Sequence, residues 1–382
     1  MIPITTNITS VDDYRWWRER GLHLTVSKMA DSPSTLLRLF PGSLGGVLPP
    51  PPTAVYSINA VLSAGVNVPF EFFSPGCTPY WQAVSSEKNA LKAFVDAGNR
   101  NETLFADLAR SPHALREEIL RSCAEGEIRC PFPTYDLVID VNQVFCNGFF
   151  HFTIEVWPRI APFLESLLAD NLPKFAIHIG CDKLKEFHPQ FYDLIGLNSS
   201  KVELIGEETV FAKEVIVPTE GLSHSPLFNY WNLVSVRTHV TERLGPIQPP
   251  GQKKTVLVIA RDASRRGDEN VYNQKFMEDL SAYLPSHHVT TYRSSDTKLM
   301  ACIECQVRAF MAADVIIGSH GAGLSHILFA KSSATVLERI VSHGNSGIYA
   351  ELSFILGMKY FPMDNLASAK AYSDIIVFAD SY

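Results

Sequence analysis

Short apolar runs separated by helical spacings organise the chain from about residue 131 onward. Between residues 131 and 243, four apolar runs predict strands at 137–141, 175–179, 202–205 and 215–217. A helical spacing over 152–169, interrupted by Pro158 and Pro162, follows the first of them. Strands that alternate with helical segments are typical of parallel α/β architecture, so we expect residues 131–243 to form one α/β domain.

From residue 255 to residue 382 the same alternation is cleaner. Strands are predicted at 255–260, 289–292, 315–317 and 335–338, with helices at 271–283, 297–313 and 324–330 between them. This order predicts a doubly wound sheet, in which ligands bind beyond the carboxyl ends of the strands. Residues 244–254 combine prolines, glycines and charge, and we expect them to link the two domains.

Residues 1–130 lack this alternation. They contain an aromatic cluster at 14–17 and four consecutive prolines at 49–52, and a helical spacing of apolar residues emerges only between 87 and 123. We expect an irregular or helical N-terminal segment that belongs to the same domain as residues 131–243. No internal repeat accompanies it.

The composition fits a globular protein of two domains. Hydrophobic residues make up 46% and charged residues 19% of the 382 residues, which excludes a disordered chain. Lys+Arg 33 against Asp+Glu 40 gives a formal net charge of −7. Without a basic excess to neutralise phosphates, nucleic acid is not expected as a partner.

No membrane-spanning or export segment is visible. The longest uncharged stretch, 53–70, is interrupted by serine, asparagine, glycine and proline, and so lacks the ~20 apolar residues that a spanning helix needs. The first 13 residues carry no basic region followed by an apolar run, as a signal peptide would. The compartment stays open: the Golgi or endoplasmic reticulum lumen if an N-terminal anchor has been removed, and otherwise the cytoplasm.

The seven cysteines lie at irregular spacings, which favours scattered reduced thiols over a disulfide framework. Cys302 and Cys305 form a C-x-x-C motif, but it falls inside the predicted helix 297–313 and not at a helix start. With no second pair and no histidine at zinc spacing, neither a metal site nor a redox site is expected there.

The clearest chemical motif follows the strand predicted at 315–317. The chain passes through a turn of small residues, with His320, Gly321, Ala322 and Gly323, and then enters a helix. Glycines let the backbone approach a ligand, and the free N–H groups of a helix start attract an anion such as a diphosphate. The alternative is that these glycines serve only tight packing.

Two further candidates lie at the ends of two other strands of the predicted sheet. Arg261, Ser264 and Arg265 follow the strand 255–260, where guanidinium groups would bind phosphate oxygens in a bidentate manner. The alternative is a solvated charged loop. Glu338 ends the strand 335–338, where a carboxylate can accept both hydroxyls of a ribose, unless it is an ordinary surface or salt-bridged residue.

These motifs resemble the C-terminal half of glycosyltransferase family 61, which includes plant β-1,2-xylosyltransferases and animal O-linked N-acetylglucosaminyltransferases. The resemblance rests on RDASRRGDEN at 261–270, GSHGAGLSHILFA at 318–330 and TVLERI at 335–340. HFTIEVWPR at 151–159 and YAELSFILGMKY at 349–360 are similar to two further segments of that family. The resemblance covers about 135–362 and does not extend to residues 1–130.

The resemblance implies a GT-B fold, with two facing Rossmann-like domains. Residues 255–382 would bind the donor nucleotide sugar, and the domain ending at 243 would bind the acceptor. The family is mostly inverting and requires no metal or other cofactor. We therefore expect transfer of N-acetylglucosamine or xylose from a UDP-sugar to a glycan or glycoprotein. The alternative function is a non-catalytic scaffold of the same fold that binds a nucleotide sugar or a glycan.

An inverting transfer needs a base near the acceptor hydroxyl. His151 and Glu155 are four residues apart and would share one face of a helix. Glu155 is the first candidate for the base, with His151 either orienting it or acting as the base itself, and Asp140 at a strand end is the reserve. The alternative for His151 is a core histidine flanked by aromatic residues. On the donor side, Arg261, Arg265 and the amides of 321–323 would stabilise the leaving diphosphate.

Overall fold

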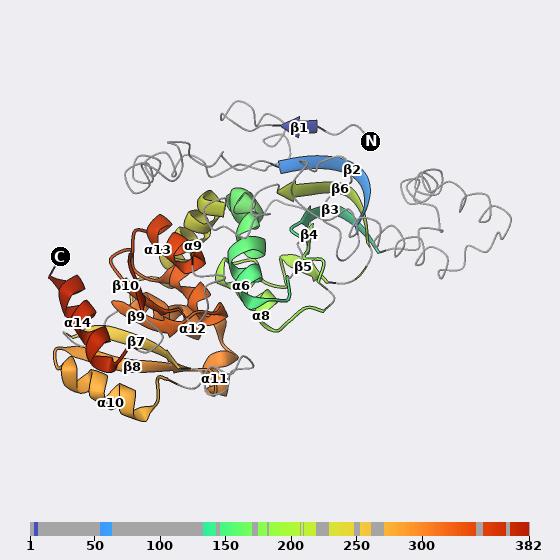
Figure 1. Ribbon diagram of the computed structural model, residues 1–382. Coiled ribbons are helices and arrows are strands. Elements are labelled where there is room, and N and C mark those ends of the chain that lie inside the picture. Colours follow the sequence, from blue (N-terminus) through green and yellow to red (C-terminus); the bar gives the residue numbers. More distant parts are fainter. Residues whose placement is uncertain are drawn as a thin grey trace, which may run out of the picture. The chain divides into compact units, whose positions relative to one another are not determined.

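The structure, a computed structural model, describes residues 4–6, 54–62, 133–142, 146–169, 175–181, 183–206, 208, 210–218, 229–247, 253–260, 271–340, 347–363 and 367–381. They form two compact units (Figure 1). The first unit holds the described residues of Met1–Val26, Pro50–Lys185 and Gly196–Ser223, and the second those of Glu186–Ile195 and His224–Tyr382. The helices predicted between 87 and 123 and the aromatic cluster at 14–17 lie outside the described residues.

The first unit is built on a sheet of the order β1-β2-β6-β3-β4-β5. Its four parallel strands are β3 (Thr134–Asp140), β4 (Phe175–His178), β5 (Val202–Ile205) and β6 (Val210–Pro218). They confirm the four strands predicted for this stretch. Two antiparallel strands that the apolar pattern did not reveal extend the sheet beyond β6, namely β2 (Ala54–Leu62) and β1 (Ile4–Thr6).

The helix predicted at 152–169 is a series of short helical segments instead. They are α6 (Phe149–His151), the π-helix η4 (Phe152–Val156), the 3₁₀-helix η5 (Trp157–Phe163) and α7 (Leu164–Leu168). Pro158 and Pro162 lack a backbone N–H, and their rings collide with the carbonyl four residues earlier in a regular α-helix. The prolines therefore explain why the hydrogen-bonding pattern changes twice within this segment.

Arg159 fixes η5 to the carboxyl ends of two strands. Its side chain is completely buried. Nη1 donates hydrogen bonds to the carbonyl oxygens of Val141 (2.9 Å) and Asn142 (3.1 Å), just past the end of β3, and Nη2 donates to the carbonyl of Pro218, the last residue of β6. A buried guanidinium with backbone acceptors satisfies carbonyls that the end of the ladder leaves unpaired.

The second unit has a fully parallel sheet of the order β11-β10-β9-β7-β8. The strands are β7 (Lys254–Ala260), β8 (His287–Arg293), β9 (Val315–Ser319), β10 (Thr335–Arg339) and β11 (Lys359–Met363). This is the doubly wound order, with the reversal between β7 and β9. The predicted doubly wound sheet is therefore confirmed, and β11 adds an edge strand that was not predicted.

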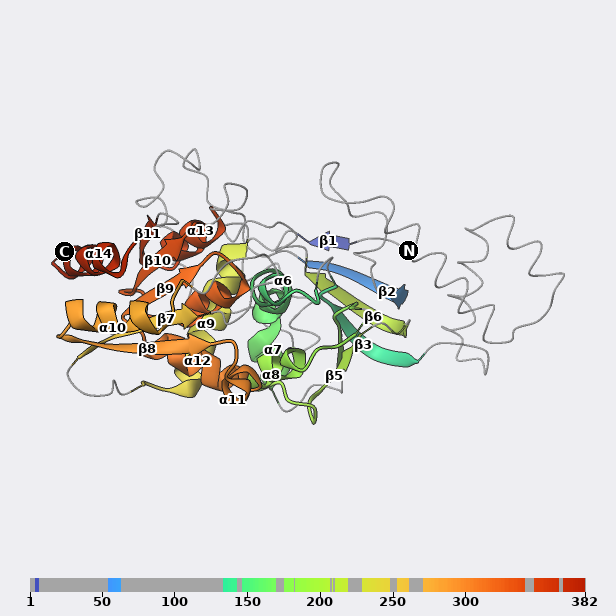
Figure 2. The same ribbon diagram turned by 60° about the horizontal axis from the view of Figure 1, so that its bottom comes forward.

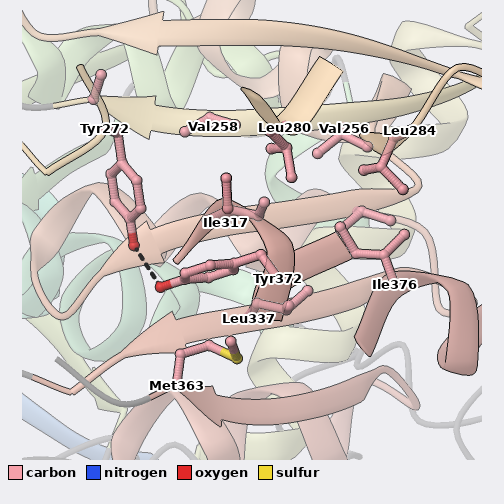
Figure 3. Packing of buried hydrophobic residues seen from close by; sticks show 13 residues of the cluster. Val256, Val258, Tyr272, Leu280, Leu284, Ile317, Leu337, Met363, Tyr372 and Ile376 are labelled. Carbon is pink, nitrogen blue, oxygen red and sulfur yellow. Dashed lines mark hydrogen bonds between the residues drawn. The ribbon is translucent and has the colours of Figure 1, made fainter. Parts of the chain in front are cut away.

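Two helices, α10 (Gln274–Tyr283) and α14 (Ala369–Asp380), cover one face of this sheet (Figure 2). Alternate residues of the strands point into the core beneath them, as a pleated sheet requires. Tyr272 and Tyr372 meet there, with their hydroxyl oxygens 3.1 Å apart (Figure 3). The buried core consists of Val256, Val258, Ala260, Tyr272, Leu280, Leu284, Val315, Ile317, Leu337, Met363, Ala369, Tyr372 and Ile376.

The opposite face carries α12 (Ile303–Ala312) and the 3₁₀-helix η7 (Ala322–Phe329), which pack against β7 and β9. Against η7 pack α13 (Ile348–Ile355) and α9 (Tyr230–Leu244), and α8 (Phe187–Leu194) packs on α12. Although α8 and α9 precede the predicted linker, they belong to the second unit. The two packed units are therefore not separated by a single boundary at residues 244–254.

Two expectations about helices and cysteines are wrong. The helix predicted at 297–313 is broken into α11 (Thr297–Met300) and α12, so the C-x-x-C motif stands at a helix start. Among the described residues, two disulfides, Cys146–Cys181 and Cys302–Cys305, stand where reduced thiols were expected. No helix within the described ranges is long and apolar enough to cross a membrane.

A buried polar network joins η7 to the sheet and to α12. Gln306 Oε1 accepts hydrogen bonds from the Tyr292 hydroxyl (2.7 Å) and from His326 Nε2 (2.9 Å). Because the amide oxygen can only accept, His326 carries its proton on Nε2. Burial disfavours the charged imidazolium and lowers the pKa of His326 from 6.5 to about 3.

This shift predicts acid sensitivity of the fold. In the unfolded chain His326 gains a proton as the pH falls through 6.5, whereas in the folded chain it stays neutral until about pH 3. Between those values the free energy of unfolding falls with decreasing pH, by at most about 1.4 kcal/mol per pH unit from this group. Urea unfolding of the wild type and of His326→Gln at several pH values measures this pH dependence of the free energy of unfolding. The variant should have the shallower dependence, and equal slopes would contradict the assignment.

Candidate functional site

The glycine turn lies at the point where the strand order of the second sheet reverses. Gly318 in β9 pairs with Ile259 in β7, so the two strands end side by side. A Cβ on Gly318 would lie 3.1 Å from the side chains of Ile259 and Leu324, and one on Gly323 would lie 3.4 Å from Ile259. Close packing therefore favours glycine at position 318, whereas a Cβ on Gly323 would make only an ordinary van der Waals contact.

Gly321 has a different role. Its φ of 149° lies in the range that favours glycine, and it caps the start of η7. The first N–H groups of a helix have no acceptor within the helix. Ala322 and Gly323 are the first two residues of η7 and carry such N–H groups. The anion site predicted for them stays a prediction.

His320 is held in place by a buried carboxylate. Its Nδ1 lies 2.6 Å from Oε1 of Glu338, and the Tyr360 hydroxyl donates to Oε2 of the same carboxylate at 2.6 Å. The Glu338 side chain is completely buried, whereas that of His320 is 17% exposed. A direct contact between Glu338 and a ribose requires an exposed carboxylate, so the geometry assigns Glu338 to holding His320 instead.

Two tyrosines of this network were missed in the sequence. Tyr349 donates a hydrogen bond to the carbonyl of Gly321 at 2.7 Å, and its ring packs edge-on against His320. Burial and the adjacent Glu338 carboxylate raise the pKa of Tyr360 above its ordinary value, so its hydroxyl keeps the proton that it donates. Both tyrosines lie in the segment 349–360, whose spacing gave no indication that they contact the turn.

Arg261, Ser264 and Arg265 lie outside the described residues, and their expected role in binding phosphate stays a prediction. The strand that leads to them, β7, ends at Ala260, beside the end of β9. The strand order reverses between β7 and β9, and doubly wound folds bind ligands beyond the carboxyl ends of the strands at such a reversal.

In the first unit, the structure brings His151 and Glu155 together. Nδ1 of His151 lies 3.0 Å from Oε2 of Glu155. The side chain of Glu155 is 1% exposed and that of His151 is 29% exposed, so the imidazole is the accessible member of the pair. Glu155 lies in the π-helix η4, and His151 is the last residue of α6, directly before it. Short π-helical segments are frequent at functional sites.

Asp140 takes part in a second and deeper pair. Its Oδ1 lies 3.0 Å from Nδ1 of His178 and accepts the backbone N–H of Asn142 at 3.1 Å. Both side chains of the pair are buried, at 0% and 2% exposure. Because the carboxylate is already hydrogen-bonded and shielded, Asp140 is less suited to meet an acceptor than His151. No group of three or more His, Cys, Asp or Glu that could hold a metal ion occurs among the described residues.

The contribution of the Tyr360–Glu338 hydrogen bond can be tested through Tyr360. In Tyr360→Phe the carboxylate loses one of its donors while the ring is retained, so the free energy of unfolding should fall by about 1.5–3 kcal/mol. Tyr283→Phe is the matched control, because Tyr283 is 48% exposed, and it should change stability by less than about 0.5 kcal/mol. Denaturant unfolding measures both variants. Equal stabilities of Tyr360→Phe and the wild type would contradict a stabilising hydrogen bond at this position.

Comparison with known proteins completes the description of the site. A family model described as Glycosyltransferase 61 matches residues 149–337, a span that begins at the His151 segment and ends within β10. An EGF domain-specific O-linked N-acetylglucosamine transferase from Bos taurus is 29% identical over 126 residues, which is 32% of this chain and 22% of the bovine protein. The chain thus matches less than a quarter of that relative's length.

Among solved structures, a mutant flavo di-iron protein from Thermotoga maritima overlaps 58% of this chain and 51% of its own, with 10% identity and a TM-score of 0.27. A score this low has no bearing on the fold. The family match instead contains both the His151–Glu155 pair and the glycine turn that follows β9. Through residues 149–337, this chain belongs to the glycosyltransferase 61 family.

Proposed function

We propose that this protein is an inverting glycosyltransferase that moves a sugar from a UDP-sugar to a glycan or glycoprotein. The observation that carries the proposal is the glycine turn at the strand-order reversal between β7 and β9, within the span matched by the family. The name of the bovine relative favours N-acetylglucosamine as the sugar to test first, with xylose as the second. A GT-B arrangement, with one unit binding the acceptor and the other the donor, fits this function.

On the donor side, the diphosphate would lie against the amides of 321–323, with Arg261 and Arg265 neutralising its charge and Ser264 adding a hydroxyl donor. His320 would contact the donor through Nε2, because Glu338 already occupies Nδ1. Positive side chains and aligned amides provide the charge stabilisation that a metal supplies in other transferases. The reaction therefore needs no bound metal.

On the acceptor side, the exposures of the pair reverse the order of candidates expected from the sequence. His151 is the accessible side chain, and Glu155 is buried behind it. We assign the base to His151, with Nε2 accepting the proton of the acceptor hydroxyl. Glu155 is a positioning residue, because its carboxylate keeps the proton of the neutral imidazole on Nδ1.

A transfer assay tests the function. The full chain is incubated with individual UDP-sugars, with and without a panel of glycans and glycoproteins, and released UDP is measured. We expect acceptor-dependent release from one donor, and the same rate in excess chelator. Activity that chelator abolishes and manganese restores would overturn the metal-independent mechanism. Binding of UDP without any turnover would instead identify a scaffold that binds a nucleotide sugar.

Variants of the pair test the assignment of the base. General-base catalysis contributes about 10²–10⁴-fold, so His151→Ala should lower kcat by that order while UDP affinity stays unchanged. Glu155→Gln should lower kcat less, because the amide still contacts the imidazole of His151 but no longer fixes its tautomer. Both variants are compared with the wild type by initial rates and by calorimetry with UDP.

Asp140→Asn is the matched control, since it removes the other histidine-bonded carboxylate of the same unit. If its fold is retained, its kcat should stay close to that of the wild type. Wild-type rates in both His151→Ala and Glu155→Gln, together with a large loss in Asp140→Asn, would move the base to Asp140.

A further inference from the structure

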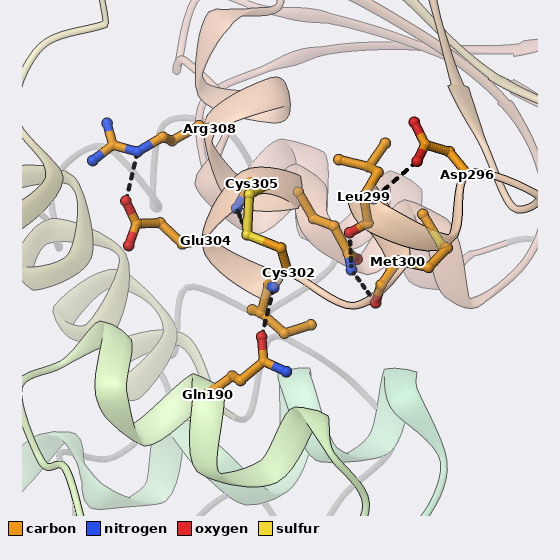
Figure 4. Close-up of a disulfide and its surroundings, with 10 residues drawn as sticks. Gln190, Asp296, Leu299, Met300, Cys302, Glu304, Cys305 and Arg308 are labelled. Atoms are coloured by element: carbon orange, nitrogen blue, oxygen red, sulfur yellow. Dashed lines mark hydrogen bonds and ion pairs between the residues drawn. A yellow bond between two sulfur atoms is a disulfide. The ribbon is translucent and has the colours of Figure 1, made fainter.

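The disulfide Cys302–Cys305 stands at the start of α12, a helix of ten residues (Figure 4). Cys302 is the N-cap residue with an extended backbone, and its sulfur accepts the N–H of Cys305 at 3.1 Å. The N–H of Ile303, the first residue of α12, donates a hydrogen bond of 2.9 Å to Oε1 of Gln190 on α8. The pair therefore occupies the end of the helix where backbone N–H groups and the helix dipole favour negative charge.

This position suits reactive cysteines better than a structural bridge. Cys305 is exposed and Cys302 half-buried, so small molecules have access to the pair. The two cysteines are only three residues apart, so the bridge closes a very short loop and removes little entropy from the unfolded chain. A cysteine at a helix N-terminus in a C-x-x-C motif has its thiolate stabilised, and this is typical of thiols that exchange disulfides.

The other disulfide of the described residues is different in each respect. Cys146 and Cys181 are separated by 35 residues, and their exposed fractions are 5% and 1%. They join the chain beyond β3 to the chain beyond β4, and burial keeps external thiols away from them. The same molecule thus contains a structural disulfide against which the reactivity of Cys302–Cys305 is measured.

The charged side chains near the pair do not cancel the stabilisation of negative charge by the start of α12. Glu304 lies in the first turn of α12, but its carboxylate is paired with Arg308 at 2.7 Å. Lys298 of α11 adds a positive charge nearby in the chain, and α8 presents the neutral Gln190. Reduction of the bridge would therefore leave a Cys302 thiolate close to N–H donors and without an unpaired acidic neighbour on its own helix.

We propose that Cys302 and Cys305 are a redox-active pair that exchanges with thiols of the glutathione class. In the reducing direction, an external thiolate attacks the exposed sulfur of Cys305. The protein S–S bond breaks, and Cys302 leaves as the stabilised thiolate. A second external thiolate attacks the outer sulfur of the mixed disulfide and releases Cys305, and both cysteines end as thiols or thiolates. Two electrons pass from two thiols to the protein, and the thiols leave as their disulfide.

The first experiment uses the wild-type full chain. It is held in buffers of varied ratios of reduced to oxidised glutathione, quenched with acid, alkylated in two isotopic steps and analysed by peptide mass spectrometry. We expect Cys302–Cys305 to open and close reversibly with the ratio, and at least about tenfold faster than Cys146–Cys181 in the same sample. Opening of both disulfides at one rate, or opening of Cys302–Cys305 only in denaturant, would overturn the proposal.

The second experiment uses the matched variants Cys302→Ser and Cys305→Ser, each of which leaves one thiol of the pair. The rate of alkylation of the remaining thiol is followed against pH by the same peptide analysis. In Cys305→Ser, the thiol of Cys302 should reach half of its plateau rate at a lower pH than the thiol of Cys305 does in Cys302→Ser. The same pH in both variants would contradict the role of the helix terminus, and the wild-type experiment decides the proposal if a variant does not fold.

Discussion

A carboxylate without water must be surrounded by hydrogen-bond donors, and this requirement organises the sheet of the second unit. Glu338 is completely buried in β10, and its two oxygens are bonded to His320, just past β9, and to Tyr360 in β11. Removing such a group from water is costly unless donors replace the lost hydration. One side chain therefore joins three neighbouring parallel strands.

The same constraint extends to the turn itself. With His320 bonded to Glu338, the next residue, Gly321, has its carbonyl bonded to Tyr349 of α13. Ile259 of β7 and Leu324 of η7 pack where Gly318 has no side chain, which holds η7 against the sheet. The backbone that would meet a ligand is thus braced from both sides, and preorganised amides of this kind stabilise charge without rearranging.

The apolar pattern predicted most strands of both sheets, because buried parallel strands are continuous runs of Val, Ile and Leu. It did not predict β11, whose sequence Lys-Tyr-Phe-Pro-Met mixes polar and apolar residues and contains Pro362. That strand lies at the sheet edge, where one side of the backbone needs no partner and proline is tolerated. The break between α11 and α12 was equally hidden, since no glycine or proline marks it and Cys302 is an unusual cap.

For the site residues, sequence spacing predicted which side chains come together, and only the structure shows which of them are buried. The spacing of His151 and Glu155 predicted their contact, and the glycine turn was recognised by its place after a strand. Sequence could not show which member of each pair is exposed. That depends on contacts between residues distant in sequence, such as the hydrogen bond from Tyr360 to Glu338.

Both units use a buried carboxylate behind a partly exposed histidine. The exposed fractions are 1% and 29% for Glu155 and His151, and 0% and 17% for Glu338 and His320. In each pair the carboxylate accepts from Nδ1, so a ligand would be met by Nε2. Under the proposed function the two histidines have different roles. His151 accepts a proton from the acceptor hydroxyl. His320 contacts the sugar donor, whose diphosphate leaving group becomes more negative during the transfer. A carboxylate that fixes the tautomer serves both roles, because each requires the second nitrogen in a defined place before the substrate arrives.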